Sequence, residues 1–235
     1  MAGLTPDRRR AEVAANLAEV EKRIAAACAA AGRDRAEVTL VAVTKTWPAS
    51  DAALLRDLGV TDLGENRDQE ARPKAAAVPD VRWHFVGRLQ TNKAASVASY
   101  ADVVEVVDRT ELVAALSAGA VRAGREIDVL LQVSLDADPH RGGAPPEHLA
   151  DLADAVVAAE GLHLRGVMAV APLAEDPAAA FARLATVAAE LRADHPRATV
   201  LSAGMSGDLE QAVAAGATHV RVGTALLGHR TSPLG

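Results

Sequence analysis

A lysine at the end of a predicted strand is the first residue of this chain that could do covalent chemistry. Lys45 ends the run TLVAVTK, and the alternation of side chains along a strand puts it on the same face as Val41 and Val43. If that face lines the interior of a barrel, desolvation disfavours the ammonium form and leaves a free amine that can attack an aldehyde. The alternative is a strand-end lysine that simply reaches solvent.

A second candidate lies near the other end of the sequence, in LSAGMSGDLEQAVAAGATHVRVGTALLG. We interpret this segment as a strand, a Gly/Ser turn, a helix, a strand and a Gly/Thr turn. Ser206 lies at the start of the predicted helix GDLEQAVAA, and Gly223 and Thr224 follow the last strand. Backbone N–H groups at such turns bind anions, so the pair predicts a phosphate site. The alternative is ordinary capping by Ser206 and a tight turn at Gly223.

An arginine belongs to the same segment. Arg221 shares a strand face with Gly223, so we expect its side chain to point inward, one layer below the turn. A buried arginine needs a partner, which is either a barrel carboxylate such as Glu65 or an atom of a ligand.

Polar residues also follow the second and third predicted strands. Glu65, Asn66, His84 and Gln90 are candidates for a pocket wall, although Asn66 could cap a helix and His84 could be a hydrogen-bonded core residue. Lys93 is either a second aldehyde-reactive lysine or a plain residue on a helix face. The sequence has no H-E-x-x-H motif, no spaced Cys/His set and no Walker-type loop, so we expect no metal and no nucleoside triphosphate.

These residues need a scaffold that brings strand ends together. Short β-branched runs alternate with alanine-rich helical stretches, which is typical of βα units around a parallel sheet. We predict eight strands, namely 39–44, 61–64, 82–86, 103–107, 128–133, 164–170, 199–202 and 219–222, with a helix after each of the first seven and only a short tail after the eighth.

The predicted fold is a single-domain (β/α)8 TIM barrel over residues 1–235, with a leading helix at 6–31 and the barrel at about 38–228. The leading helix is expected to cap the outside or the base of the barrel. A doubly wound open sheet is the alternative. The loop 136–146 is predicted to be the most mobile element because it contains ADPHRGGAPP.

Composition restricts the possible partners. A net charge of −6 and only 2% aromatic residues give no basic or stacking surface for nucleic acid. Cys28 is the only cysteine and so has no partner within the chain, and no segment has the length of apolar sequence that a membrane span needs. We therefore expect a cytoplasmic protein that binds neither nucleic acid nor membrane.

The motifs AVTK, GENRDQE, WHFVGRLQTNK, GVMAVAP, SAGMSGDLEQAVAAGATHVRVGT and LLG together resemble the pyridoxal phosphate homeostasis protein family, from about residue 10 to 229. The resemblance implies a fold-type III barrel, similar to the amino-terminal domain of alanine racemase, that carries pyridoxal 5′-phosphate (PLP). It implies a Schiff base on Lys45. The other implied cofactor contacts are Asn66 beside the ring, Arg221 at the pyridine nitrogen, Ser206, Gly223 and Thr224 at the phosphate, Ser202 as a further phosphate neighbour, and Met168 and Met205 along the pocket.

Two positions depart from the commonest family pattern. Arg67 stands where tyrosine is frequent, and His219 stands where an apolar residue is frequent. Because neither belongs to the lysine or the phosphate turns, only the shape of the pocket mouth is affected.

The resemblance implies a protein that buffers or delivers PLP, in vitamin B6 and amino-acid homeostasis, without significant turnover. The alternative is a PLP-dependent amino-acid racemase. A racemase needs a base on each face of the bound substrate, and the only tyrosine, Tyr100, is expected at the amino end of the fourth strand, away from the site. An arginine at the pyridine nitrogen also weakens the cofactor as an electron sink. A Schiff-base aldolase is a third possibility. We expect a monomer whose partners are PLP and PLP-dependent apoenzymes.

Overall fold

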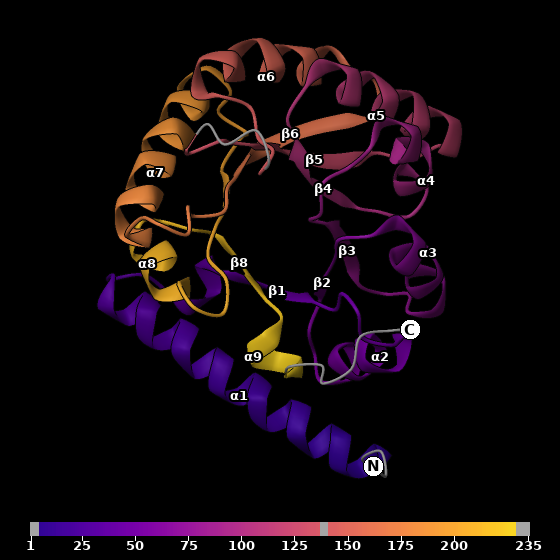
Figure 1. Ribbon diagram of the computed structural model, residues 1–235, viewed down its shortest axis with the longest axis vertical. Helices are drawn as coiled ribbons and strands as arrows, with labels where there is room; N and C mark the ends of the chain where they lie inside the picture. The colour runs from indigo at the N-terminus through magenta and orange to yellow at the C-terminus, as the bar shows by residue number, and fades with distance from the viewer. Residues whose placement is uncertain (1–4, 137–140, 229–235) are drawn as a thin grey trace.

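The computed structural model describes residues 5–136 and 141–228, and the strands found there form one closed parallel barrel (Figure 1). Strand order follows the chain, and the first strand pairs with the eighth. The strands are β1 (Thr39–Val43), β2 (Asp62–Glu65), β3 (Arg82–Phe85), β4 (Val103–Val107), β5 (Ile127–Gln132), β6 (Leu162–Met168), β7 (Val200–Ser202) and β8 (His219–Val222).

Helices surround this barrel on the outside (Figure 1). They are α1 (Pro6–Ala30), α2 (Ala49–Asp57), α3 (Asp68–Ala77), α4 (Ala94–Ala98), α5 (Thr110–Ala123), α6 (Leu149–Ala158), α7 (Pro177–Asp194), α8 (Leu209–Ala214) and α9 (Thr224–Leu227). Short 3₁₀ turns precede β1 (Arg35–Glu37), α4 (Thr91–Lys93) and α6 (Pro146–His148).

The predicted TIM barrel is confirmed, and every predicted strand lies within two residues of its expected limits. One expectation is wrong, because β8 is followed by the four-residue helix α9 and not by an irregular tail alone. The predicted mobile loop 136–146 is described only in part, since residues 137–140 lie outside the described ranges. No helix within those ranges is both long and apolar enough to cross a membrane.

Side chains of β1 show how the alternation of a strand separates two kinds of core. Leu40 and Ala42 are buried in the apolar layer between barrel and helices, together with residues of α1. Val41 and Val43 face the other way, because their methyl groups lie 3.2 Å from the place where a Cβ on Gly64 of β2 would stand. The inward-facing side chains of β1 therefore line the barrel interior up to its carboxyl end, where TIM barrels have their active or binding sites.

Helix α1 runs along the outside of the barrel and contacts α8 and α9 (Figure 1). Val13, Val20 and Ile24 form its buried stripe at helical spacing. Polar contacts add to this packing, because Arg23 makes two hydrogen bonds of 2.8 and 2.9 Å to Glu210, and Asn16 donates to the Leu226 carbonyl at 2.9 Å. Helix α1 thus lies on the outside of the barrel, which is one of the two positions predicted for the leading helix, the other being the base of the barrel.

Candidate functional site

A cavity of about 550 Å³ opens at the carboxyl ends of β1 and β8. This volume lies within the range typical of small-molecule sites. We name it the lysine cavity, and its lining consists of Val43, Lys45, Thr46, Trp47, Asn66, Val86, Gly87, Val170, Met205, Ser206, Gly207, Arg221, Gly223, Thr224 and Gly228. Seven of the predicted site residues are therefore brought together, namely Lys45, Asn66, Met205, Ser206, Arg221, Gly223 and Thr224.

Lys45 is exposed at the mouth of this cavity, as the alternative of a strand-end lysine that reaches solvent held, and it differs from the desolvated lysine of the other alternative. The difference arises because β1 ends at Val43 and Lys45 already lies in the following turn. Thr46 in that turn has a φ of 68°, and its backbone N–H donates to Glu70 Oε2 at 2.8 Å. The lysine amine is thus placed by a turn fixed to α3, and it is open to an incoming molecule.

The two predicted phosphate turns lie in contact. Ser206 does not begin α8, because that helix starts at Leu209, so the expected helix-start position is wrong. The Ser206 hydroxyl oxygen instead accepts a hydrogen bond from the Ala225 N–H in the first turn of α9, at 3.3 Å. This contact replaces the ordinary capping of α8 by Ser206, and it leaves the hydroxyl proton of Ser206 free to donate.

Arg221 lies at the floor of the lysine cavity and is 5% exposed. Its Nη1 donates to the Ser202 hydroxyl at 2.6 Å, and its Nη2 donates to the Ala169 carbonyl at 2.9 Å. The nearest carboxylate is Glu105, at 3.7 Å. Burial lowers the pKa of Arg221, against the opposing charge of Glu105, and the guanidinium remains charged.

Glu65 is not the partner of Arg221, contrary to one of the two predicted alternatives. It is buried against α3, where its Oε1 accepts from Lys74 Nζ at 2.5 Å and from the Thr44 hydroxyl at 2.6 Å. Lys74 Nζ also donates to the Thr44 carbonyl at 2.8 Å. Burial raises the pKa of Glu65, although Lys74 and Thr44 oppose the shift. This buried pair supports the turn just before Lys45.

His84 is a core residue of the barrel interior, as one predicted alternative held. Its ring nitrogens lie 2.7 Å from Glu105 Oε1 and 2.9 Å from Asp62 Oδ1. Burial acts to lower the pKa of His84, but the hydrogen bonds to the two carboxylates outweigh it and raise the pKa. Burial likewise acts to raise the pKa of Glu105, but His84 and Arg221 outweigh it and lower the pKa to about 2.

A chain of buried polar groups therefore runs up through the barrel from β2 to β8. Glu105 Oε2 accepts from the Ser202 hydroxyl at 2.6 Å, and that hydroxyl accepts from Arg221. His219, at the lower end of β8, has its ring 6.1 Å from that of His84, and burial lowers its pKa to about 4. Arg221 is the only member of this chain that also lines the lysine cavity in the described residues.

Asn66 forms the wall of the cavity on the side of β2. Its carboxamide oxygen is buried and has no hydrogen-bond partner among the described residues. Gly87 packs directly on the backbone of Asn66, because a Cβ at this glycine would stand 2.2 Å from the backbone carbonyl oxygen of Asn66. The glycine is therefore needed so that the segment after β3 can approach Asn66.

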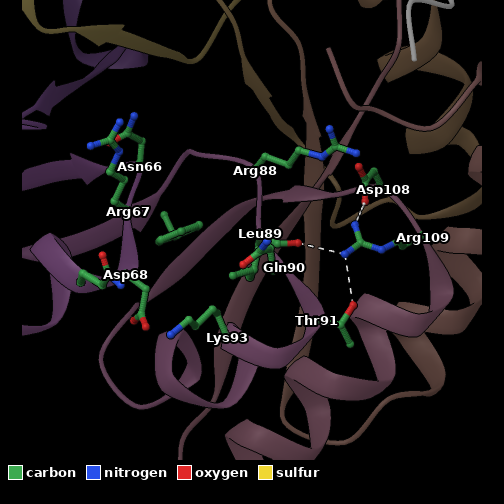
Figure 2. Close-up of a pocket in the computed structure, with 12 residues that line it drawn as sticks. Asn66, Arg67, Asp68, Arg88, Leu89, Gln90, Thr91, Lys93, Asp108 and Arg109 are labelled. Carbon is green, nitrogen blue, oxygen red and sulfur yellow. Dashed lines mark hydrogen bonds and ion pairs between the residues drawn. The ribbon is translucent and has the colours of Figure 1, made fainter. Parts of the chain in front are cut away.

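Two predicted contact residues do not line the lysine cavity. Ser202 is 0% exposed and lies beneath Arg221, and Met168 is 2% exposed at the end of β6, where it pairs with Ser202. Gln90 and Lys93 line a separate cavity over the segment that follows β3 (Figure 2). Trp47, Gly87 and Gly207 also line the lysine cavity and had no role predicted for them, although both glycines lie within the quoted motifs WHFVGRLQTNK and SAGMSGDLEQAVAAGATHVRVGT.

Tyr100 also does not line the lysine cavity. Its backbone precedes β4, as predicted, and its hydroxyl is buried close to Asp68 at the start of α3. Burial and then the Asp68 carboxylate raise the pKa of the Tyr100 phenol. The phenol therefore stays protonated at physiological pH.

Comparison with known proteins gives consistent matches. Residues 15–231 match the family described as alanine racemase, N-terminal domain. The pyridoxal phosphate homeostasis protein of Mycobacterium tuberculosis is 44% identical, over 96% of this chain and 95% of that protein. That of Escherichia coli is 37% identical, over 93% of this chain and 97% of that protein.

Solved structures agree with these matches. PipY of Synechococcus elongatus, determined with PLP bound, superposes with a TM-score of 0.78 at 36% identity and covers 92% of this chain and all of its own. An alanine racemase of Clostridium difficile has a TM-score of 0.74 at 15% identity, over 94% of this chain and 57% of that enzyme, which shows the shared barrel fold. With these matches spanning nearly its whole length, the chain belongs to the pyridoxal phosphate homeostasis protein family.

Proposed function

We propose that this protein holds pyridoxal 5′-phosphate in the lysine cavity and buffers or delivers it, in vitamin B6 and amino-acid homeostasis, without significant turnover. The observation that carries the proposal is that Lys45 shares one cavity with Ser206, Thr224 and Arg221. An amine, two hydroxyl groups and a buried cation are the groups that an aldehyde bearing a phosphate and a ring nitrogen requires.

The residues present fit this cofactor. The Asn66 carboxamide oxygen is a buried acceptor without a partner among the described residues, and it stands at the edge of the cavity. The backbone at Gly207 leaves open space, because a Cβ there would meet no atom within 4 Å. An unpaired buried acceptor is costly in an empty site, so its presence supports a bound polar ligand.

Each residue has a definite task in the proposal. The cofactor supplies an aldehyde that forms a Schiff base with a primary amine, and Lys45 is the lysine of this cavity. The Ser206 and Thr224 hydroxyls donate to the phosphate, together with the Thr224 backbone N–H, which lacks an intrahelical acceptor at the start of α9. Arg221, fixed by Ser202 and Ala169, presents its remaining N–H groups to the ring nitrogen.

The lining also supports a carrier over a racemase. Among the described residues that line the lysine cavity there is no carboxylate, histidine, cysteine or tyrosine, so Lys45 is the only side chain there that can readily exchange a proton. A racemase needs a second base on the opposite face of its substrate. Arg221 adds to the argument, because a permanent cation at the pyridine nitrogen disfavours protonation of that nitrogen and thus weakens carbanion stabilisation.

Reduction with borohydride followed by peptide mass mapping tests the proposal. The chain has four lysines, Lys22, Lys45, Lys74 and Lys93, so the position of a pyridoxyl adduct is decisive. After incubation with PLP we expect the adduct on Lys45, its loss in Lys45→Ala and its retention in Lys93→Ala. An adduct confined to another lysine, or none, would overturn the proposal. Sustained racemisation of an amino acid that depends on Lys45 would overturn the part that concerns turnover.

The proposal also covers the domain organisation, the location, the oligomeric state and the partners of the protein. We propose that residues 1–235 act as one cofactor-binding domain, that the protein works in the cytoplasm as a monomer, and that PLP-dependent apoenzymes receive the cofactor. The names of the relatives support only the part of the proposal that concerns homeostasis of this cofactor. Size-exclusion chromatography with light scattering tests the monomer.

A further inference from the structure

Lys45 lies between two peptide groups that are both held by side chains of one helix. The carbonyl of Thr44 belongs to the peptide group before Lys45, and Lys74 Nζ donates to it at 2.8 Å. The N–H of Thr46 belongs to the peptide group after Lys45, and it donates to Glu70 Oε2 at 2.8 Å. Because φ and ψ of a residue are the rotations between its two flanking peptide planes, these contacts together fix the backbone of Lys45.

The two holding residues lie on one face of α3. Glu70 and Lys74 are four positions apart, and their charged groups lie 4.0 Å from each other. We name this pair the α3 clamp. Lys74 is buried, and its Nζ also donates at 2.5 Å to Oε1 of Glu65 on β2. The clamp is therefore anchored to the barrel as well as to the helix.

The turn that the clamp holds has an unfavourable backbone conformation. Thr46 has a φ of 68°, and β-branched residues rarely adopt this left-handed conformation. Asp80 is the only other residue besides glycine with a positive φ in the described ranges. Such a conformation persists only where surrounding contacts impose it. The hydrogen bond from the Thr46 N–H to Glu70 is one contact that imposes it here.

Exposure does not distinguish Lys45 from an ordinary surface lysine, because Lys22 on α1 is exposed as well. What distinguishes Lys45 is a fixed backbone at the mouth of the cavity that Ser206 and Arg221 also line. A reacting group that is held in place before its partner arrives gains from proximity and orientation. A group on a freely rotating backbone must lose that freedom when it reacts.

We propose that Glu70 and Lys74 are positioning residues for Lys45, and that they give the protein a preference for the aldehyde form of the cofactor over the amine form. This inference rests on the proposed function. Capture forms a C=N bond between the Lys45 nitrogen and the aldehyde carbon, and the two hydrogens of the neutral amine leave with the aldehyde oxygen as water. The proposed phosphate and ring contacts serve both forms, so only the aldehyde form benefits from a fixed Lys45.

Binding of the two forms to variants of Glu70 tests this inference. Glu70→Ala removes the acceptor of the Thr46 N–H, whereas Glu70→Gln keeps an acceptor oxygen. We expect Glu70→Ala to weaken PLP binding about tenfold, as for loss of a hydrogen bond to a charged group, and pyridoxamine 5′-phosphate binding less than about twofold. Glu70→Gln, and the control Gln69→Ala at an exposed position of α3, should bind both forms as the parent does. Absorbance titration measures PLP binding, and calorimetry measures binding of the amine form.

Lys74 is tested without leaving a buried charge. Lys74→Met is combined with Glu65→Gln, because Lys74→Met alone would leave the buried Glu65 carboxylate uncompensated. In stopped-flow absorbance we expect the limiting first-order rate of Schiff-base formation at saturating PLP to fall about tenfold, since a misplaced group reacts more slowly. The half-saturating PLP concentration should stay unchanged. If this double variant does not fold, the Glu70 variants decide the question.

Two results would overturn the inference. Equal weakening of both forms in Glu70→Ala would show that the clamp supports the cavity as a whole, and unchanged PLP binding would show that Lys45 needs no clamp. In either case a pyridoxyl adduct on Lys45 of the parent, after borohydride reduction, leaves the proposed function standing. A parent protein without an adduct on Lys45 would overturn the proposed function and this inference together.

Discussion

At the scale of single residues, the proposed phosphate contacts depend on one hydroxyl that joins two turns. Ser206, after β7, accepts from the Ala225 N–H after β8, so the two turns are held at a fixed separation before any ligand arrives. Thr224 lies in the same cavity and is exposed. A site that is formed in advance loses less conformational entropy when it binds.

Removal of either hydroxyl should weaken cofactor binding measurably. We expect Ser206→Ala and Thr224→Ala each to reduce the affinity for PLP by about 0.5 to 3 kcal/mol, the range for hydrogen bonds to a charged group. Absorbance titration of the apoprotein measures this change. Ser99→Ala, which removes an exposed hydroxyl on the outside of the barrel, serves as the control. Equal affinity of the parent protein for pyridoxal without its phosphate would contradict the assignment.

The sequence was sufficient to place Lys45, Ser206 and Arg221 in one site, because strand ends of a parallel barrel meet at one rim. It was insufficient for the partner of Arg221, which is set by which side chains meet across the barrel interior. Glu65 lies within the quoted motif GENRDQE but faces α3, whereas Glu105 faces inward. The available signal was a single carboxylate in the otherwise all-valine strand VVEVV.

At the scale of elements, one buried hydrogen-bonded chain connects five of the strands. His84 on β3 bridges Asp62 on β2 and Glu105 on β4, and Glu105 in turn binds Ser202 on β7. Arg221 on β8 is attached to the end of this chain. Buried charged residues from strands that are far apart in the sequence therefore balance one another's charge. A substitution of one of these residues affects the orientation of Arg221.

This chain predicts how stability depends on pH. His84 has a raised pKa when folded, so its contribution is complete below about 6.5, its ordinary value, and is lost as the pH rises through the folded pKa. Glu105 has a lowered pKa, so its contribution is complete above about 4.5 and is lost as the pH falls toward about 2. We expect the largest contribution between these limits.

Urea unfolding at pH 5.5 and pH 8.5 measures this dependence. His84→Gln should be less stable than the parent at both values, and by more at pH 5.5 than at pH 8.5. The comparison is made between the two proteins because His219, whose pKa is lowered to about 4, favours the higher pH in both of them. His163→Gln, an exposed histidine paired with Glu126, is the control and should keep the parent's difference between the two pH values. An unchanged difference in His84→Gln would show that His84 is not protonated in the barrel.

Gly87 gives a second prediction at this scale. A Cβ there would stand 2.2 Å from the Asn66 carbonyl oxygen, so Gly87→Ala must push the segment after β3 away from β2. We expect a loss of about 1–3 kcal/mol in the free energy of unfolding, as for an overpacked core position. Thermal unfolding measures it, and Gly207→Ala, whose Cβ meets nothing within 4 Å, should leave the melting temperature nearly unchanged. Similar melting temperatures for both variants would contradict this packing.

At the scale of the whole molecule, α1 fastens the last described helix to the barrel. Asn16 and Arg9 donate to the carbonyls of Leu226 and Leu227, at 2.9 and 3.1 Å. Arg9 also lies 4.5 Å from the ring centre of Trp47, which lines the lysine cavity. The alternation of strands and helices was predictable from local sequence, but the hydrogen bonds of Asn16 and Arg9 to α9 were not, since they join residues about two hundred positions apart.

Weakening of this attachment should reach the site through α9. We expect Asn16→Ala to lower the free energy of unfolding by about 1 kcal/mol and to weaken PLP binding, because α9 begins with Thr224. Denaturant titration and absorbance titration measure the two effects. Arg10→Ala, an exposed position of α1, is expected to change neither. Loss of stability with unchanged PLP affinity would show that α9 does not need this support to hold the phosphate.

The pairing of β1 with β8 has a consequence for how the protein is made. Lys45 leaves the ribosome well before Ser206, Arg221 and Thr224 do. A nascent chain has the amine without the groups that we propose hold the phosphate, so its Lys45 would react with the aldehyde as an ordinary surface lysine does. Tight binding of the cofactor would thus begin only after β8 has paired with β1 and closed the barrel.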